Sequence, residues 1–250
     1  MIDVAGHRFD VGAVAFDKDG TLLQVDRLWV GVLRRWIEAI ADAAEAPGLA
    51  RPLRIALDIN EDHTFAPNGL AHCGTTADAR AAAVAVLTAH HIRRPEQIVG
   101  GVSAGELDPA DVVPLGDVVS TLAALKQAGL RLAVVTADDR LPTLRHLDIL
   151  GVTRLLDHVI CGDDLDIAPK PSGDALRWIA DTAQMPVHRI AMVGDSATDI
   201  ETGRNAGAGV CIGVVGDGGL PTGADLEIHT VDAIRAPEHG TGWRDRSVAS

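Results

Sequence analysis

Short apolar runs of strand length alternate with stretches of helical period through most of this 250-residue chain. The apolar runs are rich in β-branched residues and lie at residues 11–16, 130–135, 158–160, 190–193 and 210–212. The helical stretches between them lie at residues 118–127, 141–150, 175–182 and 200–206. Apolar strands separated by helices form parallel sheets that helices cover on both faces. The alternation therefore predicts the α/β class, with a doubly wound parallel sheet as the core.

Residues 24–113 break the alternation and indicate a separate helical unit. Apolar residues spaced four apart predict an amphipathic helix through Leu28, Val32, Trp36 and Ile40. Pro47 and Gly48 end this helix, and further helices are predicted at residues 76–90 and after Pro95. We predict a core domain of residues 1–23 and 114–235, an inserted helical cap domain of residues 24–113, and a loosely ordered tail of residues 236–250. The two neighbouring connections between the domains indicate a hinge.

Charge and composition argue against several kinds of partner. The formal net charge is −13 and tyrosine is absent, whereas nucleic acids select clusters of Lys and Arg and aromatic stacking surfaces. No apolar run reaches the ~18 residues of a membrane span, and the acidic start lacks the features of a signal peptide. Three widely spaced cysteines predict neither a disulfide framework nor a zinc site. We expect a cytoplasmic monomer or homodimer with no nucleic-acid or membrane partner.

The predicted strands end in residues with carboxylate or hydroxyl groups. Asp17 and Asp19 follow the first run, Thr136 follows the second, and Asp195 follows the run at 190–193. Lys170 belongs to a loop directly ahead of a predicted helix. Ligands of open α/β sheets bind beyond the carboxyl ends of the strands. These five side chains are therefore expected to converge at one edge of the sheet.

Converging acids repel one another unless a cation neutralises them. Hard oxygen ligands without a neighbouring His or Cys suit Mg²⁺, which usually takes its remaining ligands from water and a substrate phosphate. The lysine and the threonine hydroxyl are then the natural groups to hold phosphate oxygens. This set of residues predicts phosphoryl transfer.

The spacing within DKDGT, residues 17–21, supports the same chemistry. Residues two apart on an extended backbone point to the same side, so Asp17 and Asp19 can reach one phosphate. One carboxylate can attack phosphorus while the other serves the leaving oxygen. Gly20 permits the abrupt turn that frees backbone N–H groups for phosphate oxygens.

Four segments in order, DKDGT, VVTADD, APKPSGD and GDSATD, resemble the motifs of the haloacid dehalogenase superfamily. The helical insertion is similar to the cap of its phosphoglycolate-phosphatase-like members. The resemblance covers residues 11 to about 232. It implies a phosphatase that uses Mg²⁺ to hydrolyse a small phosphorylated metabolite.

The resemblance also implies roles for individual residues. Asp17 would attack phosphorus and form an aspartyl-phosphate, and Asp19 would protonate the leaving oxygen and then activate water. Asp17, the backbone carbonyl of Asp19 and Asp195 would hold Mg²⁺, with Asp199 orienting that shell. Thr136 and Lys170 would hold the phosphate.

Two other functions stay open at this point. A phosphomutase of the same superfamily would use the same core residues with a cap that shields the aspartyl-phosphate from water. A phospho-accepting signalling domain, a different class, also combines acids, a threonine and a lysine on a doubly wound sheet. The long helical insertion argues against it.

Several polar residues have two interpretations. Asp199 either supports the metal site or caps the positive end of a helix. Asp138 and Asp139 are expected to be N-caps of the following helix rather than functional groups. His63, His72 and Thr75 belong to a glycine-containing stretch of the insertion and are either substrate contacts or residues of an ordinary surface loop.

Overall fold

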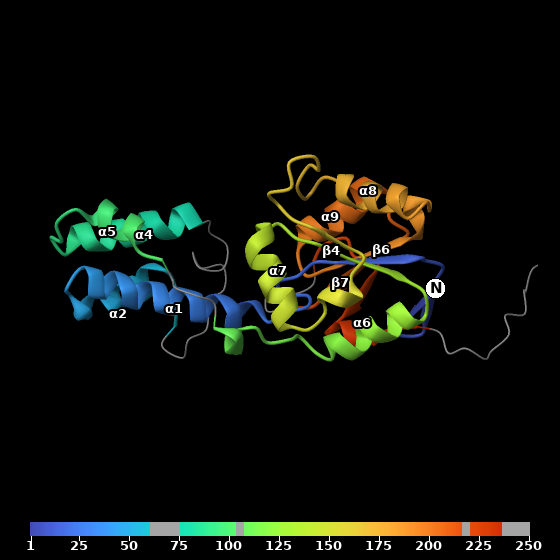
Figure 1. The fold of residues 1–250 in the computed structure, drawn as a ribbon, viewed down its shortest axis with the longest axis horizontal. Helices are drawn as coiled ribbons and strands as arrows, with labels where there is room; N and C mark the ends of the chain where they lie inside the picture. The colour runs from blue at the N-terminus through green and yellow to red at the C-terminus, as the bar shows by residue number, and fades with distance from the viewer. Residues whose placement is uncertain (61–75, 104–107, 217–220, 237–250) are drawn as a thin grey trace, which may run out of the picture.

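The computed structural model describes residues 1–60, 76–103, 108–216 and 221–236 (Figure 1). Its centre is a six-stranded parallel sheet with the strand order β5-β4-β3-β6-β7-β8. The strands are β3 Ala13–Phe16, β4 Arg131–Val135, β5 His158–Ile160, β6 Ile190–Gly194, β7 Val210–Val214 and β8 Leu226–Ile228. The predicted fold class is confirmed. The sequence runs predicted every strand of this sheet except β8, whose central residue is the exposed Glu227.

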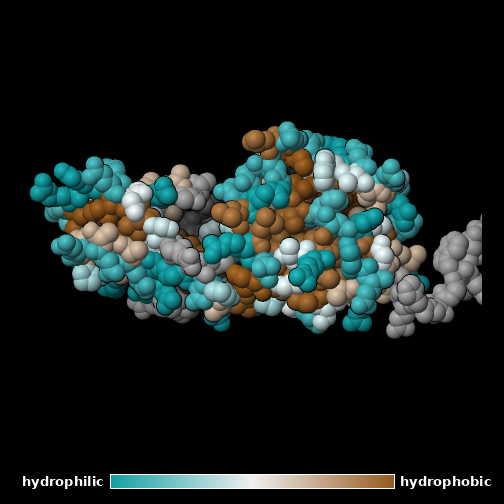
Figure 2. All heavy atoms as spheres, viewed as in Figure 1, coloured by the Kyte–Doolittle hydropathy of each residue, from teal (hydrophilic) through white to brown (hydrophobic). Residues whose placement is uncertain are grey.

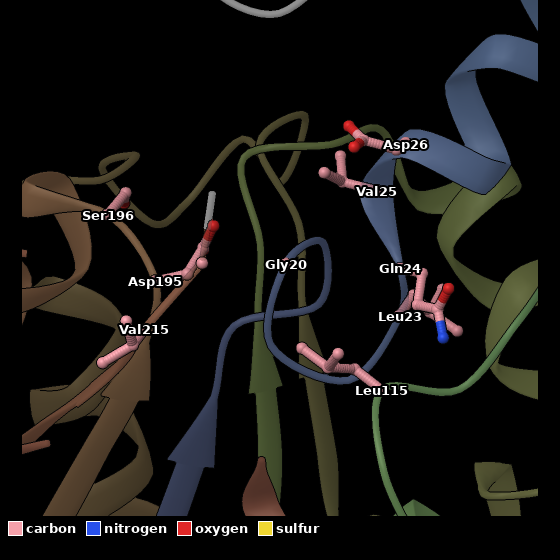
Figure 3. A pocket seen from close by; sticks show the side chains of 10 residues that line it. Gly20, Leu23, Gln24, Val25, Asp26, Leu115, Asp195, Ser196 and Val215 are labelled. Carbon is pink, nitrogen blue, oxygen red and sulfur yellow. The ribbon is translucent and has the colours of Figure 1, made fainter. Parts of the chain in front are cut away.

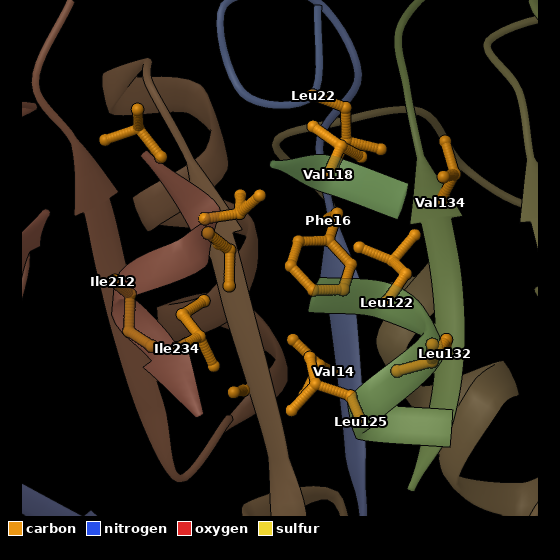
Figure 4. Close-up of a cluster of buried hydrophobic side chains, with 14 of the residues drawn as sticks. Val14, Phe16, Leu22, Val118, Leu122, Leu125, Leu132, Val134, Ile212 and Ile234 are labelled. Atoms are coloured by element: carbon orange, nitrogen blue, oxygen red, sulfur yellow. The ribbon is translucent and has the colours of Figure 1, made fainter. Parts of the chain in front are cut away.

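Helices cover both faces of the sheet, as the apolar strands required. They are α6 Val118–Gln127, α7 Arg140–Ile149, α8 Asp174–Thr182 and α9 Ala197–Ala206. Val14 and Phe16 of β3 pack against Leu122 of α6 on one face (Figure 4). Ala13 and Ala15, the alternate residues, belong to the cluster on the opposite face that includes α8 and α9. Every residue of β3 is buried, so this strand holds the groups at its end in the middle of the molecule.

The insertion consists of helices that build their own apolar core. They are α1 Val25–Ala43, α2 Ala50–Ala56, α4 Thr76–Ala89 and α5 Pro95–Gly101. Trp36 and Ile40 of α1 are buried in the same cluster as Leu53 of α2 and Leu87 of α4. In Figure 1 these helices lie to one side of the sheet. Helix α2 was not predicted, and residues 24–113 stay our proposed extent of the cap domain.

The two connections between the sheet and the inserted helices run beside each other. The backbone N–H of Gln24 donates to the carbonyl of Val113 at 2.9 Å, and the N–H of Leu115 donates to the carbonyl of Leu22 at 2.9 Å. Leu23 and Pro114 form an isolated antiparallel bridge between these bonds. The insertion is therefore attached through a short, hydrogen-bonded pair of segments.

A small antiparallel sheet lies outside the predicted elements. It joins β1 Ile2–Val4 to β2 His7–Phe9 and to β9 Ile234–Arg235. Ile2, Val4 and Ile234 are buried in the cluster that also contains Phe16. These strands have two or three residues each, too few for a periodic pattern in the sequence. Short single-turn 3₁₀ helices complete the described structure at Pro47–Leu49, Pro109–Asp111, Thr153–Leu155, Val187–Arg189 and Val231–Ala233.

The surface is mostly hydrophilic on the face drawn in Figure 2, with apolar side chains gathered around α7. Leu141 and Leu144 of α7 and Leu165 of the β5–α8 loop are exposed. No helix among the described residues is long and apolar enough to cross a membrane. The predicted tail lies outside the described residues except for Ala236.

Asp157 connects the amino ends of β4 and β5. Its carboxylate accepts hydrogen bonds from Lys126 Nζ at 2.6 Å, Arg131 Nη1 at 2.9 Å and the backbone N–H of Leu132 at 2.9 Å. Burial alone would raise the pKa of Asp157, but these hydrogen bonds, led by that of Lys126, lower it below its ordinary value. The charged form of Asp157 therefore stabilises the folded state.

Replacing Asp157 tests this interaction. Asp157→Asn is expected to lower the free energy of unfolding by about 1–3 kcal/mol at neutral pH, because hydrogen bonds to a charged group are lost. A depressed pKa gives stability that is present above the unfolded pKa and lost as the pH falls through the folded pKa. The difference from wild type should therefore stay constant from about pH 7 to about pH 5 and shrink as the pH falls below about 4 in urea unfolding curves. Asp148→Asn, at an exposed position of α7, is the control and should change little; an equal loss in both variants would contradict the assignment.

Candidate active site

Three neighbouring strands bring polar residues to the carboxyl edge of the sheet. Asp17 follows β3, Thr136 follows β4 and Asp195 follows β6, and β3 lies between the other two strands. Strand β3 pairs with β4 on one side and with β6 on the other. The strand order therefore changes direction at β3, which makes this a topological switch point. Such points are where open α/β sheets bind ligands.

Asp17, Asp195 and Asp199 form a compact acidic cluster at this edge. One carboxylate oxygen of each lies within 4.8 Å of the others. Lys170 bridges two of them, because its Nζ lies 2.6 Å from Asp17 Oδ1 and 2.6 Å from Asp199 Oδ1. The loop that carries Lys170 is bound to α9 through Asn205 Nδ2, which donates to the carbonyl of Pro171 at 2.9 Å. The structure therefore brings together four of the residues that the sequence predicted.

Burial and mutual repulsion dominate the electrostatics of this cluster. Burial raises the pKa of Asp17 well above its ordinary value, and Asp199 and Asp195 raise it further against the opposing effect of Lys170. Burial, with the charge of Asp199, also raises the pKa of Asp195 to about 6. Burial alone would lower the pKa of Lys170, but Asp17 and Asp199 raise it. One ammonium does not neutralise three carboxylates, so the cluster favours binding of a further cation.

Asp199 has one of the two roles that the sequence left open, that of a helix cap, and it also pairs with Lys170. At the start of α9 it forms a capping box: its N–H donates to Ser196 Oγ at 3.2 Å, and its Oδ2 accepts from the N–H of Ser196 at 3.1 Å. Its other oxygen, Oδ1, accepts from Lys170. Both oxygens of Asp199 are thus engaged, which leaves Asp17 and Asp195 as the better candidates for direct metal ligands.

The turn after Asp17 places its backbone against Asp195. The carbonyl of Lys18 accepts from the N–H groups of Leu22 and Leu23, and the N–H of Gly20 donates to the carbonyl of Leu23 at 2.9 Å. Gly20 has a φ of 76°, and a Cβ there would overlap Asp195 Oδ2. A glycine is required at this position both for the backbone conformation and for the close approach of the carboxylate.

Lys18 is the residue of this site that the sequence interpretation missed. Its side chain is 0% exposed, and Nζ lies 2.5 Å from Asp19 Oδ1, 2.9 Å from Asp138 Oδ2 and 3.2 Å from His146 Nδ1. Burial, together with the charge of Lys18, lowers the pKa of His146 to about 4, so the neutral ring accepts a hydrogen bond from the ammonium. Asp19, Asp138 and His146 have the spacing of metal ligands, but Lys18 already supplies a positive charge to this group.

Asp138 differs from what the sequence suggested, whereas Asp19 lies where it was predicted, directly beyond β3. Asp138 was expected to cap α7, but its carboxylate pairs with Lys18, and Asp139 occupies the N-cap position without a side-chain capping bond. Burial raises the pKa of Asp19 to about 6 even though Lys18 opposes this shift. A carboxyl group with such a pKa can both donate and accept a proton near neutral pH. The only signal in the sequence for the contacts of Lys18 was its position between the two acids of DKD.

Thr136 lies at the predicted position but already has a partner. It is buried, and its Oγ1 accepts a hydrogen bond from the N–H of Asp138 at 3.2 Å. Its hydroxyl keeps a proton to donate to a ligand. The suggested substrate contacts of the insertion, His63, His72 and Thr75, lie outside the described residues.

A cavity of about 440 Å³ opens beside the acidic cluster (Figure 3). Gly20, Asp195 and Ser196 line it from the strand ends, and Gln24 and Leu115 line it from the two connections to the inserted helices. Its volume lies within the range of about 300–1,000 Å³ that is typical of small-molecule sites. The cavity joins the acidic cluster to the segments through which the insertion is attached.

Comparisons with known proteins agree with this architecture. Residues 11–207 match the family of haloacid dehalogenase-like hydrolases. A phosphoglycolate phosphatase of Rhodospirillum rubrum is 30% identical over 80% of this chain and 78% of its own length. A plasmid-encoded phosphoglycolate phosphatase of Cupriavidus necator is 34% identical over 46% of this chain, and the match spans only about half (51%) of that protein. The chain therefore belongs to the haloacid dehalogenase-like hydrolase family.

Solved structures show the same fold at low sequence identity. A hydrolase of haloacid dehalogenase subfamily IA from Geobacter sulfurreducens superposes with a TM-score of 0.66 and is 16% identical. The match covers 91% of this chain and 96% of that protein. The similarity extends over the sheet and the inserted helices together.

The contact between Gly20 and Asp195 can be tested with a matched pair of variants. Gly6 and Gly20 both have positive φ, but nothing lies within 4 Å of a Cβ at Gly6. Gly6→Ala is expected to lower the free energy of unfolding by about 1–2 kcal/mol through backbone strain alone. Gly20→Ala should lower it by about 1–3 kcal/mol more, because its Cβ must displace Asp195. Equal losses in urea unfolding would show that the close approach is absent.

Proposed function

We propose that this protein is a Mg²⁺-dependent phosphatase that hydrolyses a small phosphate monoester through an aspartyl-phosphate on Asp17. The observation that supports this most is the buried cluster of Asp17, Asp195 and Asp199 with Lys170 bridging two of its members. The relatives named phosphoglycolate phosphatase make 2-phosphoglycolate the first substrate to test.

The acidic cluster fits a magnesium ion by its chemistry. It offers hard carboxylate oxygens within 4.8 Å of one another, and burial, together with repulsion between the carboxylates, raises the pKa values of Asp17 and Asp195. Asp17, the backbone carbonyl of Asp19 and Asp195 would hold Mg²⁺, with Asp199 oriented by Ser196 and Lys170 to support them. When bound, the ion would neutralise charge on the carboxylates and on the phosphate oxygens.

The residues of the chain would then carry out two chemical steps. A carboxylate oxygen of Asp17 attacks phosphorus while Asp19 gives its proton to the leaving alkoxide, which yields the aspartyl-phosphate and the alcohol. Asp19, now ionised, takes a proton from water as the water oxygen attacks phosphorus, which releases inorganic phosphate and restores Asp17. Lys170 and the Thr136 hydroxyl hold the phosphate oxygens during both steps.

The inserted helices are proposed to be the cap that selects the substrate. Both connections to them line the cavity beside Asp195, so movement of the insertion would change access to the acidic cluster. We retain His63, His72 and Thr75 as proposed substrate contacts of this cap. A cytoplasmic monomer or homodimer acting on a small metabolite, without nucleic-acid or membrane partners, also remains our proposal.

A panel of phosphate monoesters that includes 2-phosphoglycolate tests this function. With Mg²⁺ the wild type should release inorganic phosphate, and a chelator should abolish the release. Asp17→Asn should lower turnover by about 10⁴-fold or more, because no covalent intermediate can form and enzymes of this kind provide accelerations above ~10⁶-fold.

The matched control is Asp10→Asn, whose side chain is 76% exposed and pairs with Arg189 outside the site. It should retain wild-type turnover. Full activity in the chelator, or substantial turnover by Asp17→Asn, would contradict the proposal. Transfer of the phosphate within the substrate, without release, would instead favour the phosphomutase.

A further inference from the structure

The group around Lys18 has no part in the two chemical steps, yet it contacts one of the residues that perform them. Lys18 Nζ lies 2.5 Å from an oxygen of Asp19. Its other partners, Asp138 and His146, come from the segment at the start of α7 and from α7 itself. All three contacts converge on a side chain with 0% exposure.

A fully buried lysine ammonium is costly unless charged or polar partners compensate for its lost hydration. Removing an ammonium from water carries a penalty of several kcal/mol, and good geometry with several partners is needed to offset it. Asp138 contributes an opposite charge at 2.9 Å and His146 contributes a hydrogen-bond acceptor at 3.2 Å, both from the side of α7. Lys18 therefore has two partners besides Asp19 that hold its ammonium group in place.

Lys18 supplies the positive charge that faces the Asp19 carboxyl group. Asp19 and Asp138 are neighbouring acids, and without a cation between them their carboxylates would repel each other. The N–H of Asp138 also donates to Thr136 Oγ1, so the same group is connected to the proposed phosphate-binding hydroxyl. Asp19 and Thr136 thus contact the same group, Asp19 through Lys18 and Thr136 through the backbone of Asp138.

We propose that Lys18 is a positioning residue that holds the Asp19 carboxyl group in the orientation for proton transfer to the leaving oxygen, and that Asp138 and His146 fix Lys18 for this purpose. The inference rests on the proposed phosphatase function. Lys18 itself is not expected to touch the substrate.

Two aryl esters of similar shape test this role. Phenyl phosphate needs a proton on its leaving oxygen more than p-nitrophenyl phosphate does, so the ratio of their phosphorylation rates reports on Asp19. Lys18→Met should raise the ratio of the p-nitrophenyl rate to the phenyl rate by about tenfold in single-turnover measurements, a fraction of the ~10²–10⁴-fold that general acid catalysis supplies. When Lys18→Met is added to the Asp19→Asn variant, the ratio of the two rates should not change further.

The control is Lys126→Met, which removes another lysine that pairs with an aspartate at 2.6 Å, at the opposite edge of the sheet. It should leave the ratio unchanged. His146→Leu should raise the ratio through Lys18, whereas His146→Gln, which keeps an acceptor for the ammonium, should restore the wild-type value. If Lys18→Met fails to fold, the two His146 variants test the proposal in its place. A crystal structure of the variant that folds should show the Asp19 carboxyl group turned from its wild-type position.

The outcomes separate this inference from the function on which it rests. If the wild type cleaves both esters and the variants slow both equally, Lys18 is only structural and the inference is wrong. An unchanged ratio in Lys18→Met would overturn it as well. If the wild type cleaves neither ester with Mg²⁺, the proposed function fails and the inference fails with it.

Discussion

The structure depends on two buried ammonium groups, whose positive charges offset the negative charges of several carboxylates gathered at the end of β3. Lys170 bridges Asp17 and Asp199, and Lys18 lies between Asp19 and Asp138. Buried ion pairs seldom add much stability, because desolvation offsets the Coulomb attraction. Their presence at the switch point of the sheet is better explained by a role in the chemistry of the site than by a contribution to the stability of the fold.

The alternation of side chains along β3 explains why the two ammonium groups remain separate. Phe16 faces the cluster with α6 and α7, and Ala15 faces the cluster with α8 and α9. Continuing this pattern, Asp17 meets partners from the α8 and α9 side and Lys18 meets His146 of α7. One extended segment thus sends neighbouring residues to different sides of the sheet, where each finds its own counter-charge.

The sequence predicted the fold and most of the acidic cluster because both follow from local patterns. Strand ends identified Asp17 and Asp195, and the loop ahead of α8 identified Lys170. The group around Lys18 could not be found in the same way: lysines are almost never fully buried, and the partners of Lys18 lie far along the chain. Strands β1, β2, β8 and β9 have two or three residues each and lack two β-branched apolar residues in succession, which is the signal that Val159 and Ile160 gave for the equally short β5.

The central claim is that Asp17, Asp195 and Asp199 are tolerated together for the sake of a bound cation. It is tested most directly by thermal unfolding of wild type and Asp195→Asn at about pH 8, with a chelator or with Mg²⁺. In the chelator, Asp195→Asn should unfold at a higher temperature than wild type, because one repelling charge is gone. Mg²⁺ should stabilise the wild type, by about 2.7 kcal/mol at 100 times its dissociation constant, and Asp195→Asn far less. A less stable Asp195→Asn protein in the chelator, or equal stabilisation of both proteins by Mg²⁺, would contradict the account.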